Sequence, residues 1–168
     1  MSEPMNNDNN PALTQPEKLV AYAGFGIRLA AALIDTVILL LITVPLSLSI
    51  YGNQFFAGGA IILGPADFLI NWVAPAIVII VFWVTLSATP GKIILKLKVL
   101  DAETGRPISL GQAIGRYLAY FLSFIPLGAG YFWIFLDARK QGWHDKLAKT
   151  VVVVERSSEE PVRFDKQV

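Results

Sequence analysis

The sequence of 168 residues contains no cysteine and only one histidine, and 16% of its residues are charged. The lack of cysteine excludes disulfides, thiolate metal sites and thiol nucleophiles, and a single histidine excludes a multi-histidine metal site. We therefore expect no metal and no other cofactor. We also expect no enzyme activity, because no nucleophile, base and hydrogen-bond donor are grouped in one recognisable motif.

Basic residues are missing from the start of the chain, where the first is Lys18. A secretory signal peptide would open with a positive region, so residues 1–18 are not one. These residues are polar, and we expect them to form a disordered cytoplasmic tail. The remaining chain divides into a transmembrane domain over residues 19–156 and a flexible tail over residues 157–168.

Two long runs are almost free of charge in a chain that is 54% hydrophobic. Residues 29–50 contain one charged side chain, Asp35, and residues 68–88 contain none. Each run meets the length of roughly 20 apolar residues that a helix needs to cross a bilayer. The sequence therefore predicts an integral membrane protein with two full spans, the second of them flanked by Trp72 and Trp83 as interfacial aromatics.

A third apolar region, residues 117–136, is interrupted by Pro126, Gly128 and Gly130. Residues 110–136 are too few for two full spans, but the interruption permits a turn between two helices of about 16 and 10 residues, roughly 24 and 15 Å long. We expect a tilted hairpin with a short or re-entrant second arm; one kinked span is the alternative. Ser109 and Gln112 form a capping-box pattern at the start of this region.

Basic residues are distributed unevenly between the connections. Residues 51–67 contain no lysine or arginine, whereas residues 89–110 and the segment after Asp137 are rich in both. By the positive-inside rule the first connection lies outside the cytoplasm and the other two lie inside, which puts the N-terminus in the cytoplasm. Residues 95–99 alternate apolar and basic side chains and residues 150–155 are β-branched, so both are typical of strands.

The predicted fold class is therefore an all-α transmembrane protein. It has two full spans, a broken third and fourth helical hairpin, and a small cytoplasmic β element.

The first apolar run carries its carboxylate about nine residues beyond Gly26, roughly 13 Å into the bilayer. An Asp at that depth costs about 3 kcal/mol, which the surrounding Leu, Ile and Val residues outweigh. Asp35 is either a proton or cation site between helices or a helix-packing link. Arg28 shares its helix face but points toward the headgroups, where snorkelling alone would explain it.

Arg116 is the predicted partner of Asp35, because it lies inside an otherwise apolar run of the third helix. Two buried groups of opposite sign can neutralise each other if their helices touch. Ala30, Ala31 and Ala32 are small enough to allow that close approach.

Several motifs resemble those of the RDD family of bacterial membrane proteins, named for an arginine and two aspartates. The matching residues are Arg28 and Asp35 in GFGIRLAAALID, and Asp145 in HDKLAKT. The cytoplasmic motif Thr89-Pro90-Gly91-Lys92 and the segment LKVLD that follows it also match. Lys96 and Lys149 stand where many members have glycine.

The resemblance implies a multi-pass protein of the bacterial inner membrane. Some family members have been proposed to exchange sodium or other monovalent cations for protons, so it suggests that Asp35 binds a cation or proton. Because one subunit has few helices, we expect a homo-oligomer or a complex with another membrane protein. The alternative is a non-transporting module that binds a partner protein or anionic lipid.

Asp145 follows the single histidine, His144, in a basic segment. It either meets Arg28 at the inner membrane surface and closes a gate, or caps a turn on a solvated tail. Adjacent helical residues do not face each other, so His144 and Asp145 are not expected to act as a catalytic pair. The motif at Thr89 lacks the first glycine of a phosphate-binding loop, so we expect neither a nucleotide site nor nucleic acid binding.

Overall fold

The structure is a computed structural model that describes residues 21–56 and 61–155. All of these residues belong to one compact unit. The predicted tails, residues 1–18 and 157–168, lie outside the described residues.

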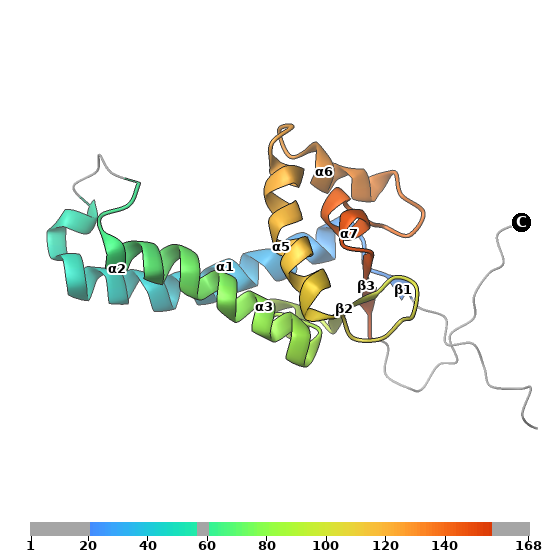
Figure 1. Cartoon of the computed structure of the whole chain (residues 1–168), viewed down its shortest axis with the longest axis horizontal. Coiled ribbons are helices and arrows are strands. Elements are labelled where there is room, and N and C mark those ends of the chain that lie inside the picture. Colours follow the sequence, from blue (N-terminus) through green and yellow to red (C-terminus); the bar gives the residue numbers. More distant parts are fainter. Residues whose placement is uncertain (1–20, 57–60, 156–168) are drawn as a thin grey trace, which may run out of the picture. The chain divides into compact units, whose positions relative to one another are not determined.

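Two long apolar helices lie side by side (Figure 1). The first is α1 (Phe25–Tyr51), continued by the 3-10 helix η2 (Gly52–Phe56). The second joins α2 (Pro65–Phe68), the π-helix η3 (Leu69–Val73), α3 (Ala74–Leu86) and α4 (Pro90–Ile94). Both are long and apolar enough to cross a membrane, and only 11% and 6% of their most apolar windows are buried within the chain. Their apolar side chains therefore face outward, as lipid requires.

The third apolar region is broken at the turn that Pro126, Gly128 and Gly130 predict. Helix α5 (Leu110–Phe124) is followed by α6 (Ala129–Phe132) and the 3-10 helix η4 (Trp133–Phe135), with a bend of 111° between α5 and the α6–η4 segment. Gly128 has φ 77° in this turn, a value that glycine adopts without strain. The predicted break is confirmed, while the number of membrane crossings stays a prediction.

Helix α5 is polar inside and apolar outside. Its buried side chains are Ala113, Arg116, Ala119 and Ser123, and this face packs against α7 (Trp143–Leu147). Leu118, Phe121 and Leu122 point outward and are exposed. The predicted capping box is present, because Gln112 N–H donates to Ser109 Oγ and Ser109 N–H donates to Gln112 Oε1. This inverted pattern fits a helix in contact with lipid.

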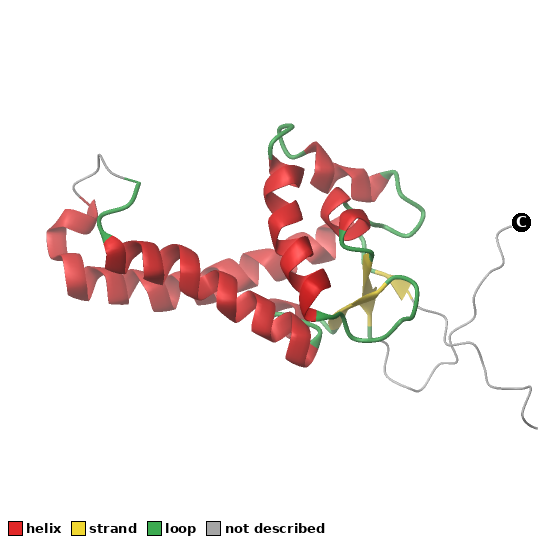
Figure 2. Cartoon of the chain, viewed as in Figure 1, coloured by secondary structure: helices red, strands yellow, loops and turns green. Residues whose placement is uncertain are grey.

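A three-stranded antiparallel sheet lies near α5 and α7 (Figure 2). Its order is β1 (Ala21–Tyr22), β3 (Thr150–Val154), β2 (Leu97–Asp101), with Val153 between Tyr22 and Lys98. Two of these strands confirm the predicted β element, although β2 begins two residues later than predicted because α4 and a turn occupy residues 90–96. Strand β1 was not predicted, since two residues carry no alternation.

The core lies where the sheet meets α1, α3 and α5. It contains Leu97, Val99 and Val152 of the sheet together with Ala31 and Trp83. Trp83 is 2% exposed and is therefore a core residue, while its place at a membrane interface stays a prediction. Its large ring packs against Tyr120 and Arg116 of α5, with the Trp83 and Tyr120 ring centres 5.8 Å apart.

Two short units repeat the same local structure. Helix α4 ends before Lys96 and strand β2, and α7 ends before Lys149 and strand β3. Lys96 has φ 55° and Lys149 has φ 52°, both in the left-handed region. This is the position after a helix end that glycine normally fills, which explains the glycine expected there in the family.

Replacing Lys96 by glycine should therefore raise the free energy of unfolding by about 1 kcal/mol, because a lysine at positive φ is strained. Lys98→Gly is the matched control: it removes the same charge from strand β2, where glycine should lower stability by a similar amount. Unfolding in detergent, followed by circular dichroism, measures both. Equal destabilisation by the two variants would contradict the assignment of strain to Lys96.

Candidate functional site

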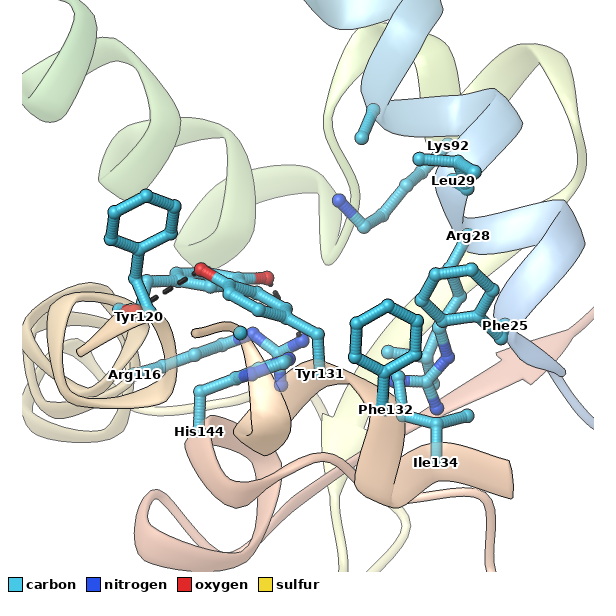
Figure 3. A pocket seen from close by; sticks show the side chains of 14 residues that line it. Phe25, Arg28, Leu29, Lys92, Arg116, Tyr120, Tyr131, Phe132, Ile134 and His144 are labelled. Carbon is cyan, nitrogen blue, oxygen red and sulfur yellow. Dashed lines mark hydrogen bonds between the residues drawn. The ribbon is translucent and has the colours of Figure 1, made fainter. Parts of the chain in front are cut away.

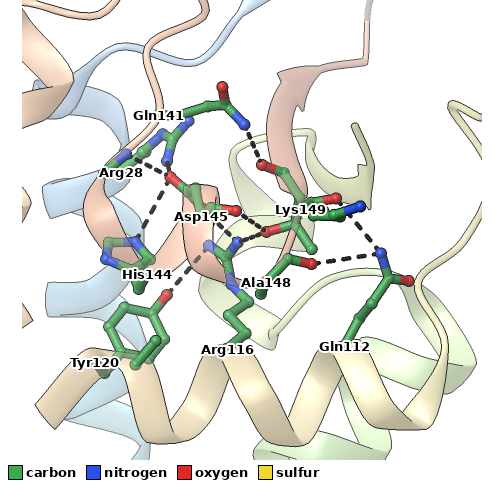
Figure 4. Close-up of polar contacts among 12 residues, drawn as sticks. Arg28, Gln112, Arg116, Tyr120, Gln141, His144, Asp145, Ala148 and Lys149 are labelled. Carbon is green, nitrogen blue, oxygen red and sulfur yellow. Dashed lines mark hydrogen bonds and ion pairs between the residues drawn. The ribbon is translucent and has the colours of Figure 1, made fainter. Parts of the chain in front are cut away.

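Asp145 is the buried centre of an ionic network (Figure 4). It occupies the third position of α7, and its side chain is fully buried. Its Oδ2 atom accepts a hydrogen bond of 2.9 Å from Gly142 N–H, so the carboxylate caps its own helix. The same carboxylate contacts two arginines from other helices.

Arg28, in the first turn of α1, uses its guanidinium to tie three segments together. Its Nη1 atom lies 2.5 Å from Asp145 Oδ2. Its Nε–H donates to the carbonyl of Ala23 at 2.8 Å, and its Nη2–H donates to the carbonyl of Lys140 at 2.6 Å. Because all three nitrogens have acceptors, Arg28 holds α1, the end of β1 and the loop before α7 in one arrangement.

Arg116 approaches Asp145 from α5. Its Nη1 atom pairs with Asp145 Oδ1 and also donates to Thr150 Oγ1. Its guanidinium carbon lies 5.3 Å from the centre of the Trp83 ring, a cation–π arrangement. Arg116 is 1% exposed, and its Nε–H has no hydrogen-bond partner among the residues that the structure describes. The arginine is thus buried with its charge only partly satisfied.

Burial alone would raise the pKa of the Asp145 carboxyl, but the positive charges of Arg116 and Arg28 outweigh burial and hold this pKa well below its usual value. Burial lowers the pKa of His144 to about 3, aided by the same two charges and opposed by Asp145. The histidine is therefore neutral at neutral pH, and its ring stacks on Tyr120 with centres 4.2 Å apart. His144 Nε2 lies 3.6 Å from Asp145 Oδ2 without forming an ion pair.

Asp35 is held by neutral donors rather than by a basic side chain. Its Oδ2 atom accepts from Thr89 Oγ1 at 2.5 Å and its Oδ1 atom accepts from Gly91 N–H at 2.7 Å. Both donors lie at the start of α4, so Asp35 of α1 caps that short helix. Thr89 Oγ1 in turn accepts a hydrogen bond of 3.2 Å from Lys92 Nζ.

The structure separates the predicted site residues into two groups. Arg28, Arg116 and Asp145 form one group with His144 beside it, and Asp35, Thr89, Gly91 and Lys92 form the other, with Pro90 in the first turn of α4.

Three sequence-based expectations can be compared with these contacts. The contact between Arg28 and Asp145 is confirmed, while its action as a gate stays a prediction. The prediction that Arg116 pairs with Asp35 is wrong, because the shorter α7 brings Asp145 to that arginine. Asp145 does cap its helix, but the solvated tail expected around it is wrong because the residue is buried.

Other polar residues of the network were not predicted. Tyr120 and Ser123 follow Arg116 on the same face of α5, and Ser123 Oγ accepts from His144 N–H at 3.1 Å. Gln141 donates to the carbonyl of Thr150 at 2.8 Å. The spacing of Arg116, Tyr120 and Ser123 by four and three residues is the signal that could have identified the polar face.

Two cavities border these groups. One, of about 430 Å³, is lined by Asp35, Thr36, Thr89 and apolar residues of α1 and α3. The other, of about 440 Å³, is lined by Arg28, Lys92, Arg116 and a wall of apolar and aromatic side chains; we call it the basic chamber (Figure 3). Lys92 lines both cavities. Within residues 21–56 and 61–155 no cluster of three or more His, Asp or Glu side chains could hold a metal ion.

Comparisons with known proteins identify the family but not an activity. The chain is 35% identical over 150 residues to the uncharacterized protein YxaI of Bacillus subtilis, an alignment that covers 78% of this chain and 96% of that protein. It is 39% identical over 74 residues to the uncharacterized protein RP437 of Rickettsia prowazekii, covering 44% of this chain and 40% of that protein.

A third relative is a proline-rich antigen homolog of Mycobacterium tuberculosis, which is 38% identical over 69 residues, 41% of this chain and 29% of that protein. No solved structure matches the chain. The sequence profile of the RDD family matches residues 22–149, a stretch that contains Arg28, Asp35 and Asp145. Two apolar helices, one of them carrying Asp35, and a buried ionic network that joins Arg28 to Asp145 thus fit the sequence match, and the chain belongs to the RDD family.

Proposed function

We propose that this RDD-family membrane protein exchanges a monovalent cation for a proton at Asp35. The observation that carries the proposal is a carboxylate on an apolar helix that lines a cavity of about 430 Å³. No lysine, arginine or histidine lies within ion-pair distance of Asp35 in the part of the chain that the structure describes. An ionisable group in such a place is a functional candidate by default.

The hydrogen bonds of Asp35 leave room for a further ligand. Each carboxylate oxygen has two lone pairs, and each accepts one hydrogen bond, from Thr89 or Gly91. A proton or a monovalent cation at a remaining lone pair would neutralise the charge. Because either one satisfies the same carboxylate, the two compete for it.

The position of Lys92 gives a physical reason why cation binding and proton release should be coupled. Its ammonium is joined to Asp35 through the hydroxyl of Thr89. With both groups ionised this unit is neutral, so an added cation would leave a net positive charge in a medium of low dielectric constant. With Lys92 charged, the unit carries the same net charge when Asp35 holds a proton as when it holds a monovalent cation. A cation that displaces the Asp35 proton therefore adds no net charge, and this favours exchange over simple uptake.

We also propose a location, an orientation and an oligomeric state for the chain. We place it in the bacterial inner membrane with its basic segments in the cytoplasm, following the distribution of Lys and Arg. Two long helices cannot by themselves enclose a polar path, so we propose a homo-oligomer. The assigned role is transport, with no catalytic step.

A second candidate function is a non-transporting module that binds a partner protein. It is favoured by the helix-capping role of Asp35, which holds α4 against α1 and would by itself explain a polar group there. The two candidates differ in one measurable property, the movement of protons.

Asp35→Asn should reduce cation-driven proton flux at least tenfold, because asparagine keeps the size of the side chain but cannot carry the exchanged charge. The measurement uses the purified full chain in proteoliposomes, with an imposed sodium, lithium or potassium gradient and a pH-sensitive dye inside. Asp67→Asn is the matched control, because Asp67 is a buried carboxylate of the second apolar helix that accepts hydrogen bonds from Asn71 Nδ2 and Leu63 N–H and does not line the cavity. It should retain flux.

Absence of flux in the unaltered protein would refute exchange with the ions tested and leave the partner-binding module. Equal flux in Asp35→Asn and in the unaltered protein would refute the role of Asp35.

A further inference from the structure

The basic chamber is distinct from the Asp35 cavity in its charge. Three basic side chains line it, Arg28 from α1, Lys92 from α4 and Arg116 from α5. The carboxylate that faces them is Asp145, and both of its oxygens are already occupied by the two arginines. Lys92 therefore has no carboxylate partner among the described residues, although it is only 9% exposed.

A buried ammonium group without a direct anionic partner is costly, and Lys92 reaches the Asp35 carboxylate only through the hydroxyl of Thr89. Lys92 Nζ makes one hydrogen bond, to Thr89 Oγ1, and an ammonium can donate three. In Figure 3 the end of the Lys92 side chain points into the space between Tyr120 and Arg28. The chamber thus presents an unfilled donor beside two further positive charges, which is the chemistry of an anion site.

The rest of the lining restricts which anion fits. Phe25, Leu29 and Phe132 line the chamber, and the rings of Phe25 and Phe132 stack with centres 5.6 Å apart. Leu29, Phe124 and Phe132 are exposed, so the chamber has apolar side chains along its outer edge. Leu29 belongs to the first apolar helix, which is long and apolar enough to cross a membrane. A small hydrated anion gains nothing from such a wall, whereas an acyl chain does.

We propose that the basic chamber binds the phosphate headgroup of an anionic phospholipid, with Lys92 on the phosphate and an acyl chain along Phe25, Leu29 and Phe132. The phosphate supplies the direct anionic partner that Lys92 lacks among the described residues. Arg28 and Arg116 keep their bonds to Asp145, and their positive charges attract the phosphate electrostatically. This binding does not depend on cation exchange, since the chamber and the Asp35 cavity have different linings apart from Lys92, Ala32 and Tyr120.

The test measures lipid binding to the full chain, purified in a neutral detergent and freed of lipid, by native mass spectrometry. Phosphatidylglycerol should bind at one site per chain, at least tenfold more tightly than phosphatidylcholine. Lys92→Met should weaken phosphatidylglycerol binding about tenfold, the loss expected for one charge-assisted hydrogen bond. Lys92→Arg keeps the charge and should retain most of the binding.

Lys96→Met is the matched control, because it removes the same charge from an exposed lysine four residues along the chain and outside the chamber. It should leave the affinity within about twofold of the unaltered chain, since exposed charges contribute little. Equal losses in Lys92→Met and Lys96→Met would overturn the proposal in favour of general surface attraction.

Inorganic phosphate distinguishes a lipid from a free anion. It should displace phosphatidylglycerol only at millimolar or higher concentration, because it gains nothing from the apolar wall. Displacement by phosphate at the concentration at which the lipid itself binds would assign the chamber to a free anion and overturn the lipid. Equal binding of the two lipids would also overturn it.

Discussion

Asp145→Asn should lower the free energy of unfolding by about 3–5 kcal/mol, the cost of removing one partner from a buried ionic network. The substitution keeps the size of the side chain, so packing around α7 is preserved. It removes the charge that compensates Arg28 and Arg116, and both guanidinium groups are nine-tenths buried or more. The asparagine side chain also has an NH2 donor in place of one carboxylate oxygen, and this donor would face an arginine.

The measurement is unfolding of the full chain in detergent, followed by circular dichroism. Glu103→Gln is the matched control, because Glu103 pairs with Lys149 at the surface, where both side chains are more than two-thirds exposed. This pair should be worth less than about 1 kcal/mol. If the Asp145 and Glu103 variants were equally stable, the network would not be the ionic anchor that its geometry indicates.

The apolar helices could be predicted from the sequence because their signal is local and strong. Residues 29–50 and 68–88 contain so little charge that the two long helices follow from length alone. The break at Pro126 and the capping box at Ser109 are equally local, since each depends on residues within one or two turns. These features are independent of what the helices pack against.

The partners of the charged residues could not be predicted in the same way. Arg28 and Asp145 are 117 positions apart, and Asp145 lies in a helix of five residues, too short to show which face is buried. Asp35 and Arg116 have opposite charges in apolar surroundings, but depth and sign do not determine which helix carries the partner. The small side chain of Ala31 did predict a close approach, although the neighbour is α4 rather than α5.

The buried polar contacts determine how α4 and α7 are attached to α1. The antiparallel pairing of β1 with β3 and the bonds of Arg28 attach α7 and the loop before it to the start of α1. Asp35 attaches α4 to the middle of the same helix. Two aspartates and one arginine of the family motif thus hold α4, at the end of the second apolar helix, and α7, after the broken third region, against α1, and Arg28 and Asp35 each line one of the two cavities.

Gly91→Ala should destabilise the protein by about 3 kcal/mol, because the added methyl group overpacks a contact between two backbones and displaces a hydrogen bond. A Cβ atom at Gly91 would collide with the carbonyl oxygen of Ala31 and lie 3.0 Å from Asp35 Cγ. The carbonyl belongs to α1 and cannot rotate away, so α4 must move and draw Gly91 N–H off Asp35.

Gly115→Ala is the matched control in α5, where a Cβ meets nothing within 4 Å. Alanine should stabilise that helix by about 0.5–1 kcal/mol. Opposite shifts of the unfolding midpoint in detergent are expected; a neutral Gly91→Ala would show that α1 and α4 do not meet at this glycine.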